Sequence, residues 1–289
     1  MGSIFDVGCA PAKPPEAAAF ACPAPRATTD WSRLCTEAFA EFMGTLVFTV
    51  FGSLAVDAAY GNGLALAVVV FCTLTVSGGR LNPCVSFAIC SVKLVVGDEG
   101  TVTTALVHAV TETVVQVAGA CAGSALAKAM ARGVPCHSCC FDAGPGVPDG
   151  IVFAHEMLGT FLLVSTVLAV AVDRTGHEYH QRSQFMVVAP LAVGFALFVA
   201  ANAAGPYTGG AMNPARVLGS VLTGCPSSAA TLSAFVFGEY AGSLVAIAIH
   251  LAKDKIRLSY EKDNEALVAR YTKESAAATN AAWPTIKLH

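Results

Sequence analysis

Long hydrophobic stretches separated by short polar connections run through most of this chain. Six of them are close to the ~20 apolar residues that cross a ~30 Å hydrocarbon core. They cover 34–56, 61–79, 102–130, 151–172, 184–204 and 229–252. Two further stretches, 83–92 and 214–222, are too short, because at about 1.5 Å per residue each spans roughly 15 Å, half of that core. The pattern therefore predicts six membrane-spanning helices and two half-helices that enter from opposite faces and meet.

Composition agrees with this membrane pattern. Hydrophobic residues make up 55% of the chain and charged residues 13%, whereas an ordinary soluble domain has about 25% charged residues. The formal net charge is only −3, and no basic block with interleaved aromatic residues indicates a nucleic-acid partner. We expect an integral, multi-pass protein whose surroundings are the lipid bilayer.

The two ends of the chain, outside the hydrophobic stretches, are predicted to be tails. Residues 1–33 are rich in Ala and Pro, so we expect a mostly disordered N-terminal tail. Residues 253–289 are polar and basic, with a short helical pattern near Leu258–Tyr271. Lys and Arg gather on one side of the membrane if both tails and the connections after spans two and four lie there. The positive-inside rule then places both termini in the cytoplasm.

A short motif occurs once in each half of the chain. The two copies are Gly78-Gly79-Arg80-Leu81-Asn82-Pro83-Cys84 and Gly209-Gly210-Ala211-Met212-Asn213-Pro214-Ala215. Spans one and four also match, as Glu41-Phe42-Met43-Gly44-Thr45 and Glu156-Met157-Leu158-Gly159-Thr160. Because each half, about 34–130 and 151–252, has an odd number of spans, the second copy must lie upside down. An inverted repeat of this kind places its functional site at the membrane midplane.

The chemistry of the paired motif favours a channel for neutral solutes. Non-helical backbone is tolerated at membrane depth only where it is buried in protein or lines a water-filled cavity. Pro83 and Pro214 suit the first turn of a helix, so Asn82 and Asn213 would stand at two helix N-termini with amide donors directed into a lumen. Two positive helix ends at one midpoint oppose cations and protons, while a neutral molecule passes by exchanging hydrogen bonds.

On these motifs, the chain resembles the aquaporin, or major intrinsic protein, family over roughly residues 34–252. The second motif, Thr208 to Arg216, is highly specific for that family, and the first, Ser77 to Pro83, is moderately specific. The resemblance implies an all-α, right-handed bundle with an inverted repeat, usually a homotetramer with one pore per subunit. It also implies that Glu41 and Glu156 accept hydrogen bonds from the re-entrant loops, and it implies no cofactor.

The resemblance further implies a narrow gate at four positions, which spacing from Asn82 and Asn213 carries over to this chain. These positions are Asn62, Ala201, Gly210 and Arg216. Water-selective relatives place an aromatic residue and a histidine at the first two. Without these rings we expect a wider, more polar gate that passes water together with glycerol, urea, hydrogen peroxide or a metalloid acid. Val217 stands against a glycerol specialist, because typical glycerol-conducting relatives have an acidic residue there.

The sequence leaves the roles of several residues open. Cys84 replaces the usual alanine, either as a small packing substitution or as a thiol that faces the lumen. Arg80 stands where the family commonly has histidine, near the cytoplasmic mouth, and Glu112 lies one helical turn from His108. The loop cysteines are Cys136, Cys139 and Cys140. We weigh a disulfide or a metal site there against free thiols and favour free thiols, so no metal is expected.

Two other classes of membrane protein compete with the channel. A coupled transporter also uses inverted repeats, but it would need an ionisable relay at the midpoint, where this chain has amides. A non-conducting structural protein remains an alternative. No nucleophile–base or metal-binding motif indicates an enzyme. The sequence leaves open whether the plasma membrane or an intracellular or vacuolar membrane holds the protein.

Overall fold

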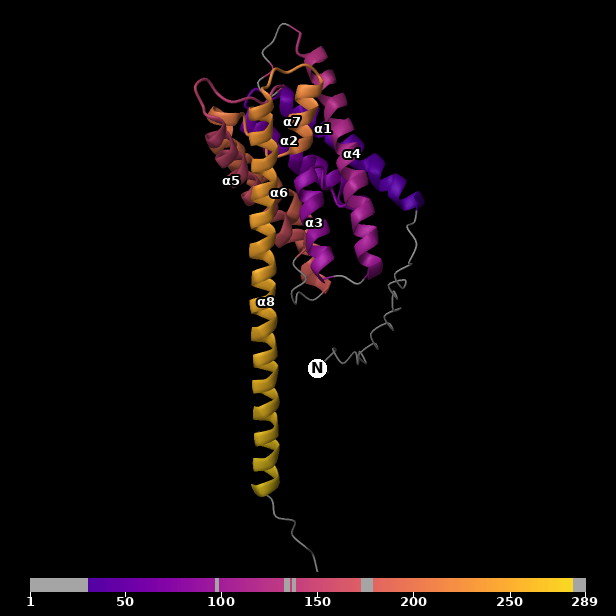
Figure 1. The fold of residues 1–289 in the computed structure, drawn as a ribbon. Coiled ribbons are helices and arrows are strands. Elements are labelled where there is room, and N and C mark those ends of the chain that lie inside the picture. The colour runs from indigo at the N-terminus through magenta and orange to yellow at the C-terminus, as the bar shows by residue number, and fades with distance from the viewer. Residues whose placement is uncertain (1–30, 97–98, 133–135, 137–138, 173–178, 283–289) are drawn as a thin grey trace, which may run out of the picture.

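The computed structural model describes residues 31–96, 99–132, 136, 139–172 and 179–282, and this part of the chain folds into a bundle of helices without a strand (Figure 1). Most of the predicted N-terminal tail therefore lies outside the described residues. The helices are α1 (Trp31–Leu54), α2 (Ala58–Thr73), α3 (Pro83–Val96), α4 (Glu99–Met130), α5 (Asp149–Val167), the π-helical turn η1 (Leu168–Val172), α6 (Tyr179–Thr208), α7 (Pro214–Leu222) and α8 (Ala229–Ala282).

Five of these helices, α1, α4, α5, α6 and α8, are long and apolar enough to cross a membrane. The second predicted span, 61–79, is different, since α2 has only 16 residues. Its helical hydrogen bonding continues beyond Thr73, because Ser77 N–H donates to Thr73 O and Gly78 N–H donates to Leu74 O. The stretch is therefore a helix followed by turns that lead directly into the first re-entrant loop.

The inverted repeat is visible in the packing of the long helices. α1 packs against α4 in the first half, and α5 packs against α8 in the second. At the two crossings Gly119 of α4 faces the carbonyl oxygen of Phe42, and Gly242 of α8 faces that of Met157, so closely that a Cβ atom would collide with either oxygen. Small residues allow such close approach of membrane helices. Phe42 and Met157 each follow a glutamate of the repeat, so the two crossings occupy equivalent places in the two halves.

The half-helices α3 and α7 lie toward opposite ends of the bundle (Figure 1), and both pack against α4 and α8. Each begins with a proline, Pro83 or Pro214. Proline fits a first helical position because the N–H that it lacks would have no partner there. The predicted pair of half-helices is thus present, and α3 is slightly longer than predicted.

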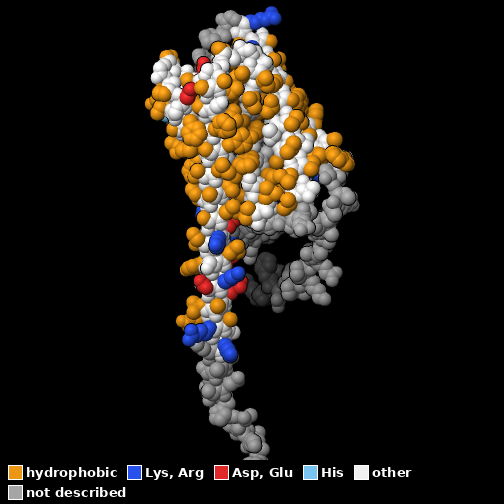
Figure 2. All heavy atoms as spheres, viewed as in Figure 1, with side chains coloured by type: hydrophobic (Ala, Val, Ile, Leu, Met, Phe, Trp, Pro, Cys, Tyr) orange, Lys and Arg blue, Asp and Glu red, His pale blue; other side chains and the backbone are white. Residues whose placement is uncertain are grey.

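Helix α8 extends far beyond the bundle as one uninterrupted helix (Figure 1). The sequence predicted only a short helix near Leu258–Tyr271. No Gly or Pro interrupts the segment from 243 to 282, so nothing in it ends the helix that begins in the membrane span. Figure 2 shows hydrophobic side chains over the bundle and charged side chains along the extension of α8.

Candidate functional site: two half-helices that meet in a candidate pore

The two re-entrant loops repeat the same unusual backbone. Each contains two glycines with positive φ, followed two residues later by a larger residue in the left-handed region, Leu81 (φ 52°) or Met212 (φ 45°). Non-glycine residues seldom adopt this conformation, and such backbone is concentrated at functional sites. In both loops the left-handed residue directly precedes the asparagine.

The asparagines join the loops to each other by reciprocal hydrogen bonds. Asn82 Nδ2 donates to the carbonyl oxygen of Met212 at 2.7 Å. Asn213 Nδ2 donates to the carbonyl oxygen of Leu81 at 2.8 Å. The left-handed residues therefore turn their carbonyl groups toward the opposite half-helix, and the two N-termini are fixed against each other.

Each asparagine also caps its own half-helix. Asn82 Oδ1 accepts the N–H of Cys84 at 2.9 Å, and Asn213 Oδ1 accepts the N–H of Ala215 at 3.0 Å. A side-chain amide has two N–H donors. One of them is used across the loop junction, so the second can serve a molecule in the lumen.

Buried carboxylates hold both loops in place. Glu41 accepts the backbone N–H groups of Arg80 at 3.0 Å and Leu81 at 2.6 Å, and the hydroxyl of Ser77 at 2.5 Å. A buried carboxylate is costly unless it is hydrogen-bonded, and these donors supply that compensation.

Glu156 repeats this arrangement in the second half. It accepts the N–H groups of Ala211 at 3.2 Å and Met212 at 2.7 Å, and the hydroxyl of Thr208 at 2.6 Å. The hydroxyl group of Thr208 in turn accepts the N–H of Gly210 at 3.0 Å. Both sequence-predicted glutamates therefore lie against the loops.

Two buried polar residues that the sequence analysis missed complete the half-sites. Gln116 Nε2 donates to Glu41 Oε2 at 2.8 Å, and Glu239 Oε1 accepts the N–H of Asn213 at 2.6 Å. Gln116 and Glu239 each lie three residues before the glycine of a helix crossing, Gly119 or Gly242. They occupy equivalent places in the repeat. A polar residue three positions before a glycine in each of two apolar spans was the signal that could have identified them.

A cavity lies where the loops meet. Polar backbone and amide groups of both loops line it, and apolar side chains from α1, α2, α3, α5, η1 and α6 also form its wall. The lining residues include Gly78, Arg80, Asn82, Met212, Asn213, Val70, Leu163, Val193 and Leu197. A wall of this kind offers a passing molecule few hydrogen-bond partners except at the junction of the loops.

The structure brings the four predicted gate residues together in two pairs. Arg216 is fully buried, and its Nη1 donates to Asn62 Oδ1 at 2.6 Å. Asn62 Nδ2 donates to Ala58 O at 2.7 Å. Gly210 lies against Ala201, because a Cβ atom on Gly210 would be 2.8 Å from the Ala201 Cα.

Two aromatic rings that the sequence analysis did not place also contact the gate arginine. The Arg216 guanidinium carbon is 4.7 Å from the centroid of the Phe48 ring and 4.9 Å from that of Phe141. Phe48 lies seven residues after Glu41 on α1, so helical spacing could have put it on the same face. Phe141 lies in the loop after α4, and no periodic signal marks it.

The remaining charged candidates pair with other charged side chains. The sequence left the role of Arg80 open, and its guanidinium forms a salt bridge with Glu112. His108, one helical turn from Glu112, has its Nδ1 2.9 Å from Glu37 Oε2. Glu112 and His108 thus bind different partners because α4 faces both α1 and the first loop.

Cys84 is fully buried in the hydrophobic core, and its carbonyl oxygen accepts the hydroxyl of Ser243 at 3.0 Å. This burial favours the packing interpretation over a thiol that faces the lumen. It also places the first residues of α3 in contact with α8.

The expectation of free loop thiols was wrong. Cys136 and Cys139 form one disulfide, and Cys140 and Cys225 form another. The second bond joins residues 85 positions apart whose Cα atoms are 5.5 Å from each other. Only the fold brings the loop after α4 next to the end of α7, so the sequence did not indicate this pairing.

Comparisons with known proteins agree with this architecture. The model of the family "Major intrinsic protein" matches residues 28–250. Aquaporin TIP2-1 of Arabidopsis thaliana is 37% identical over 202 residues, which are 62% of this chain and 72% of the relative. Probable aquaporin PIP2-8 of Oryza sativa subsp. japonica is 34% identical over 242 residues, 76% of this chain and 81% of the relative.

A solved structure shares the fold. The X-ray structure of the aquaglyceroporin from Plasmodium falciparum superposes with a TM-score of 0.59 at 21% identity, and the match covers 75% of this chain and 95% of that one. The family match spans both halves of the repeat. The chain therefore belongs to the major intrinsic protein family, the aquaporin family of membrane channels.

Proposed function

We propose that this channel conducts water and small uncharged solutes and excludes protons and ions. The observation that carries the proposal is the pair of reciprocal bonds, Asn82 to Met212 and Asn213 to Leu81. These bonds hold two half-helix N-termini at one point of a cavity that both loops line. A passing molecule meets two amide donors there and few other partners.

Charge exclusion follows from the fields at this point. The N-termini of α3 and α7 each carry a partial positive charge. A water molecule that accepts hydrogen bonds from both asparagines directs its own hydrogens away along the pore, so it does not relay a proton through the junction. Arg216 adds a full positive charge at the gate.

The solute range follows from the gate residues. Asn62, Ala201 and Gly210 carry no ring, and the Asn62 amide holds Arg216 from the side. Uncharged molecules with oxygen atoms that accept from Arg216 suit this gate, among them urea, glycerol, hydrogen peroxide and metalloid acids. Val217 gives no acidic acceptor beside the arginine.

We also propose a homotetramer with one pore per subunit, in the plasma membrane or a vacuolar or other intracellular membrane. Large apolar side chains lie exposed on α2 and α6, including Val68, Phe71, Leu191 and Phe195. They suit contact with lipid or with a neighbouring copy. The basic extension of α8 suits the cytoplasmic side.

The test uses purified protein in lipid vesicles. Stopped-flow light scattering gives the permeability to water and to each solute, and a pH-sensitive dye inside the vesicles reports proton entry. We expect flux that does not depend on membrane potential or pH gradient. Flux driven by a proton gradient would support a coupled transporter instead, and zero water permeability would support a structural protein.

A further inference from the structure

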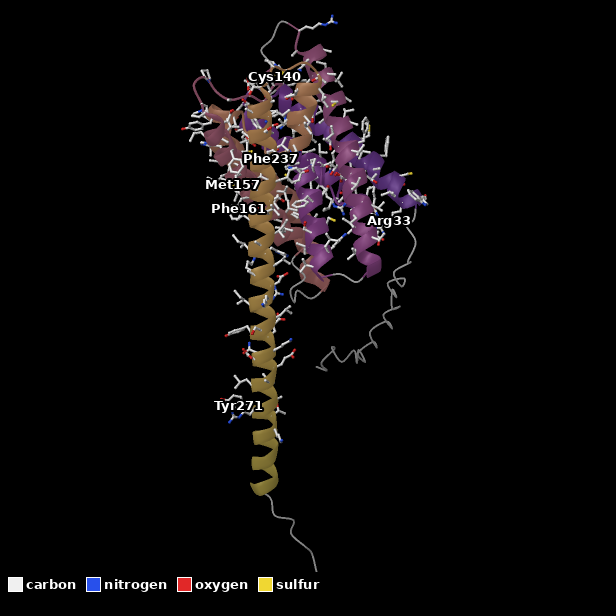
Figure 3. All side chains as sticks on the ribbon, in the orientation of Figure 1. Arg33, Cys140, Met157, Phe161, Phe237 and Tyr271 are labelled. Atoms are coloured by element: carbon white, nitrogen blue, oxygen red, sulfur yellow. A yellow bond between two sulfur atoms is a disulfide. The ribbon has the colours of Figure 1, made fainter. Side chains whose placement is uncertain are left out.

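A short segment crosses the end of the bundle that lies away from the α8 extension. We call residues 139–148 the strap. Figure 3 shows Cys140 of the strap at one end of the molecule and Tyr271 of α8 at the other. Gly144 N–H donates to the Tyr207 carbonyl oxygen at 2.8 Å, and the Cys140–Cys225 disulfide ties the strap to the residues after α7.

The strap brings one aromatic ring to the gate. Phe141 is 2% exposed, and its ring lies 4.9 Å from the guanidinium carbon of Arg216, which also contacts Phe48. The same ring lies beside the second re-entrant loop, because a Cβ atom on Gly209 would be 3.4 Å from it. Phe141 therefore touches both the charged residue of the gate and the loop that carries Asn213.

This ring can restrict the gate, where Asn62, Ala201 and Gly210 carry no ring. Arg216 Nε and Nη2 make no hydrogen bond with any residue that the structure describes, so Asn62 and the two rings limit where the guanidinium can move. A cation held over an aromatic face is stabilised by the ring quadrupole. Displacing Phe141 would remove one of these restraints and free space beside Arg216 and Gly209.

The disulfide fixes the ring relative to the arginine. Cys140 directly precedes Phe141, and Cys225 follows α7, the short helix that carries Arg216. The covalent bond thus ties the backbone of the ring to the element that bears its partner. Phe141 also packs with Val217 and Phe235, and these apolar contacts persist when the disulfide is reduced.

We propose that the Cys140–Cys225 disulfide holds Phe141 against Arg216, so that reducing this bond admits larger uncharged solutes. The inference rests on the proposed channel function. A dithiol supplies two electrons and two protons, the sulfur–sulfur bond breaks to give two thiols, and the dithiol becomes a cyclic disulfide.

The first test measures the ratio of glycerol to water permeability in vesicles. Phe141→Leu keeps an apolar side chain in the cluster but removes the ring, and we expect the ratio to rise roughly tenfold. Phe235→Leu is the matched control, because Phe235 packs in the same cluster and is not one of the two rings over Arg216. Its ratio should stay at the wild-type value. An unchanged ratio in Phe141→Leu, with normal water flux, would overturn the proposal.

The second test uses dithiothreitol on the wild-type channel. We expect a reversible rise in the ratio that is smaller than in Phe141→Leu, because the apolar contacts remain. The Cys140→Ser, Cys225→Ser variant should have the raised ratio without reductant and no further response. The Cys136→Ser, Cys139→Ser variant should respond like wild type. A response that survives loss of Cys140 and Cys225 would refute the disulfide's role.

The two proposals fail in different ways. Oxidised wild-type vesicles that pass neither water nor any solute contradict the channel function itself. Vesicles that conduct normally, and whose glycerol-to-water ratio ignores both the ring and the disulfide, contradict only the role of Phe141.

Discussion

The two re-entrant half-sites share one scaffold but surround it with different charges. In both, a buried glutamate accepts two loop N–H groups and a hydroxyl, and an asparagine binds the opposite loop. The neighbours then diverge. Gln116 stands in the first half where Glu239 stands in the second, and Arg80 has a carboxylate partner where Arg216 has an amide.

This difference indicates which of the two arginines, Arg80 or Arg216, has a positive charge that no carboxylate balances. Glu112 balances the charge of Arg80 locally. Among the described residues no carboxylate pairs with Arg216, whose contacts are Asn62 and two aromatic rings. The shared scaffold therefore sets geometry in both halves, whereas of these two arginines only Arg216 lacks a carboxylate partner among the described residues.

Removing a scaffold carboxylate should have the largest effect and tests whether both halves depend on it. Glu41→Leu removes the acceptor of four donors and Glu156→Leu that of three, and a buried unsatisfied donor costs about 1–3 kcal/mol. We expect both variants to lose most water permeability and folded yield, measured by stopped-flow and thermal melting on size exclusion. Glu261→Leu, on the exposed part of α8, is the control. Loss in only one half would break the shared-scaffold comparison.

Replacing each arginine by glutamine should show that Arg80 contributes mainly to stability and Arg216 mainly to the exclusion of protons. Arg80→Gln leaves Glu112 without its partner, and breaking a buried pair costs about 3–5 kcal/mol, so its melting temperature should fall strongly. Arg80→Gln with Glu112→Gln should recover stability. Arg216→Gln should instead raise proton entry in the dye assay. Equal proton leak in both single variants would contradict the assignment of the free charge to the second half.

The gate prediction is sharpened by the variant Asn62→Phe, Ala201→His, which supplies the rings of water-selective relatives. We expect the ratio of solute to water permeability to fall roughly tenfold, because both substitutions reduce the aperture beside Arg216. Each solute of the panel is measured against wild type. An unchanged ratio would show that these positions do not control passage.

Giving Glu239 and Gln116 each other's side chain should lower the stability of the protein moderately and to different extents. Glu239→Gln keeps an oxygen that can accept from Asn213, so we expect a loss of less than about 1 kcal/mol. Gln116→Glu replaces a donor with a second carboxylate beside Glu41 and should be clearly less stable. Thermal melting measures both. Equal losses would mean that the two places are interchangeable.

The smallest effect is expected for Cys84→Ala, which makes the two motifs alike at that position. Cys84 is fully buried, as is Ala215 in the second motif. Water permeability and its inhibition by mercurials should match wild type. A variant that loses mercury sensitivity would show that the thiol is reached from the lumen.

Much of the fold and of the central site could be predicted from sequence. Hydrophobic length located the spans and the two short helices, since crossing the bilayer requires a minimum number of apolar residues. Pro83 and Pro214 marked the starts of the half-helices, and Asn82 and Asn213 marked their meeting point. The length of α8 was underestimated because the polar residues after Lys253 show only a weak helical pattern. No Gly or Pro interrupts them, however, and the helix continues.

The sequence by itself determined the inverted repeat, the paired asparagine turns and the two buried glutamates, because each is a local pattern that occurs twice. Only the tertiary structure decided that Glu112 pairs with Arg80, that Cys225 bonds Cys140, and that a loop ring reaches Arg216. These contacts join segments far apart in the chain. Their partners are selected by helix packing, which local periodicity does not encode.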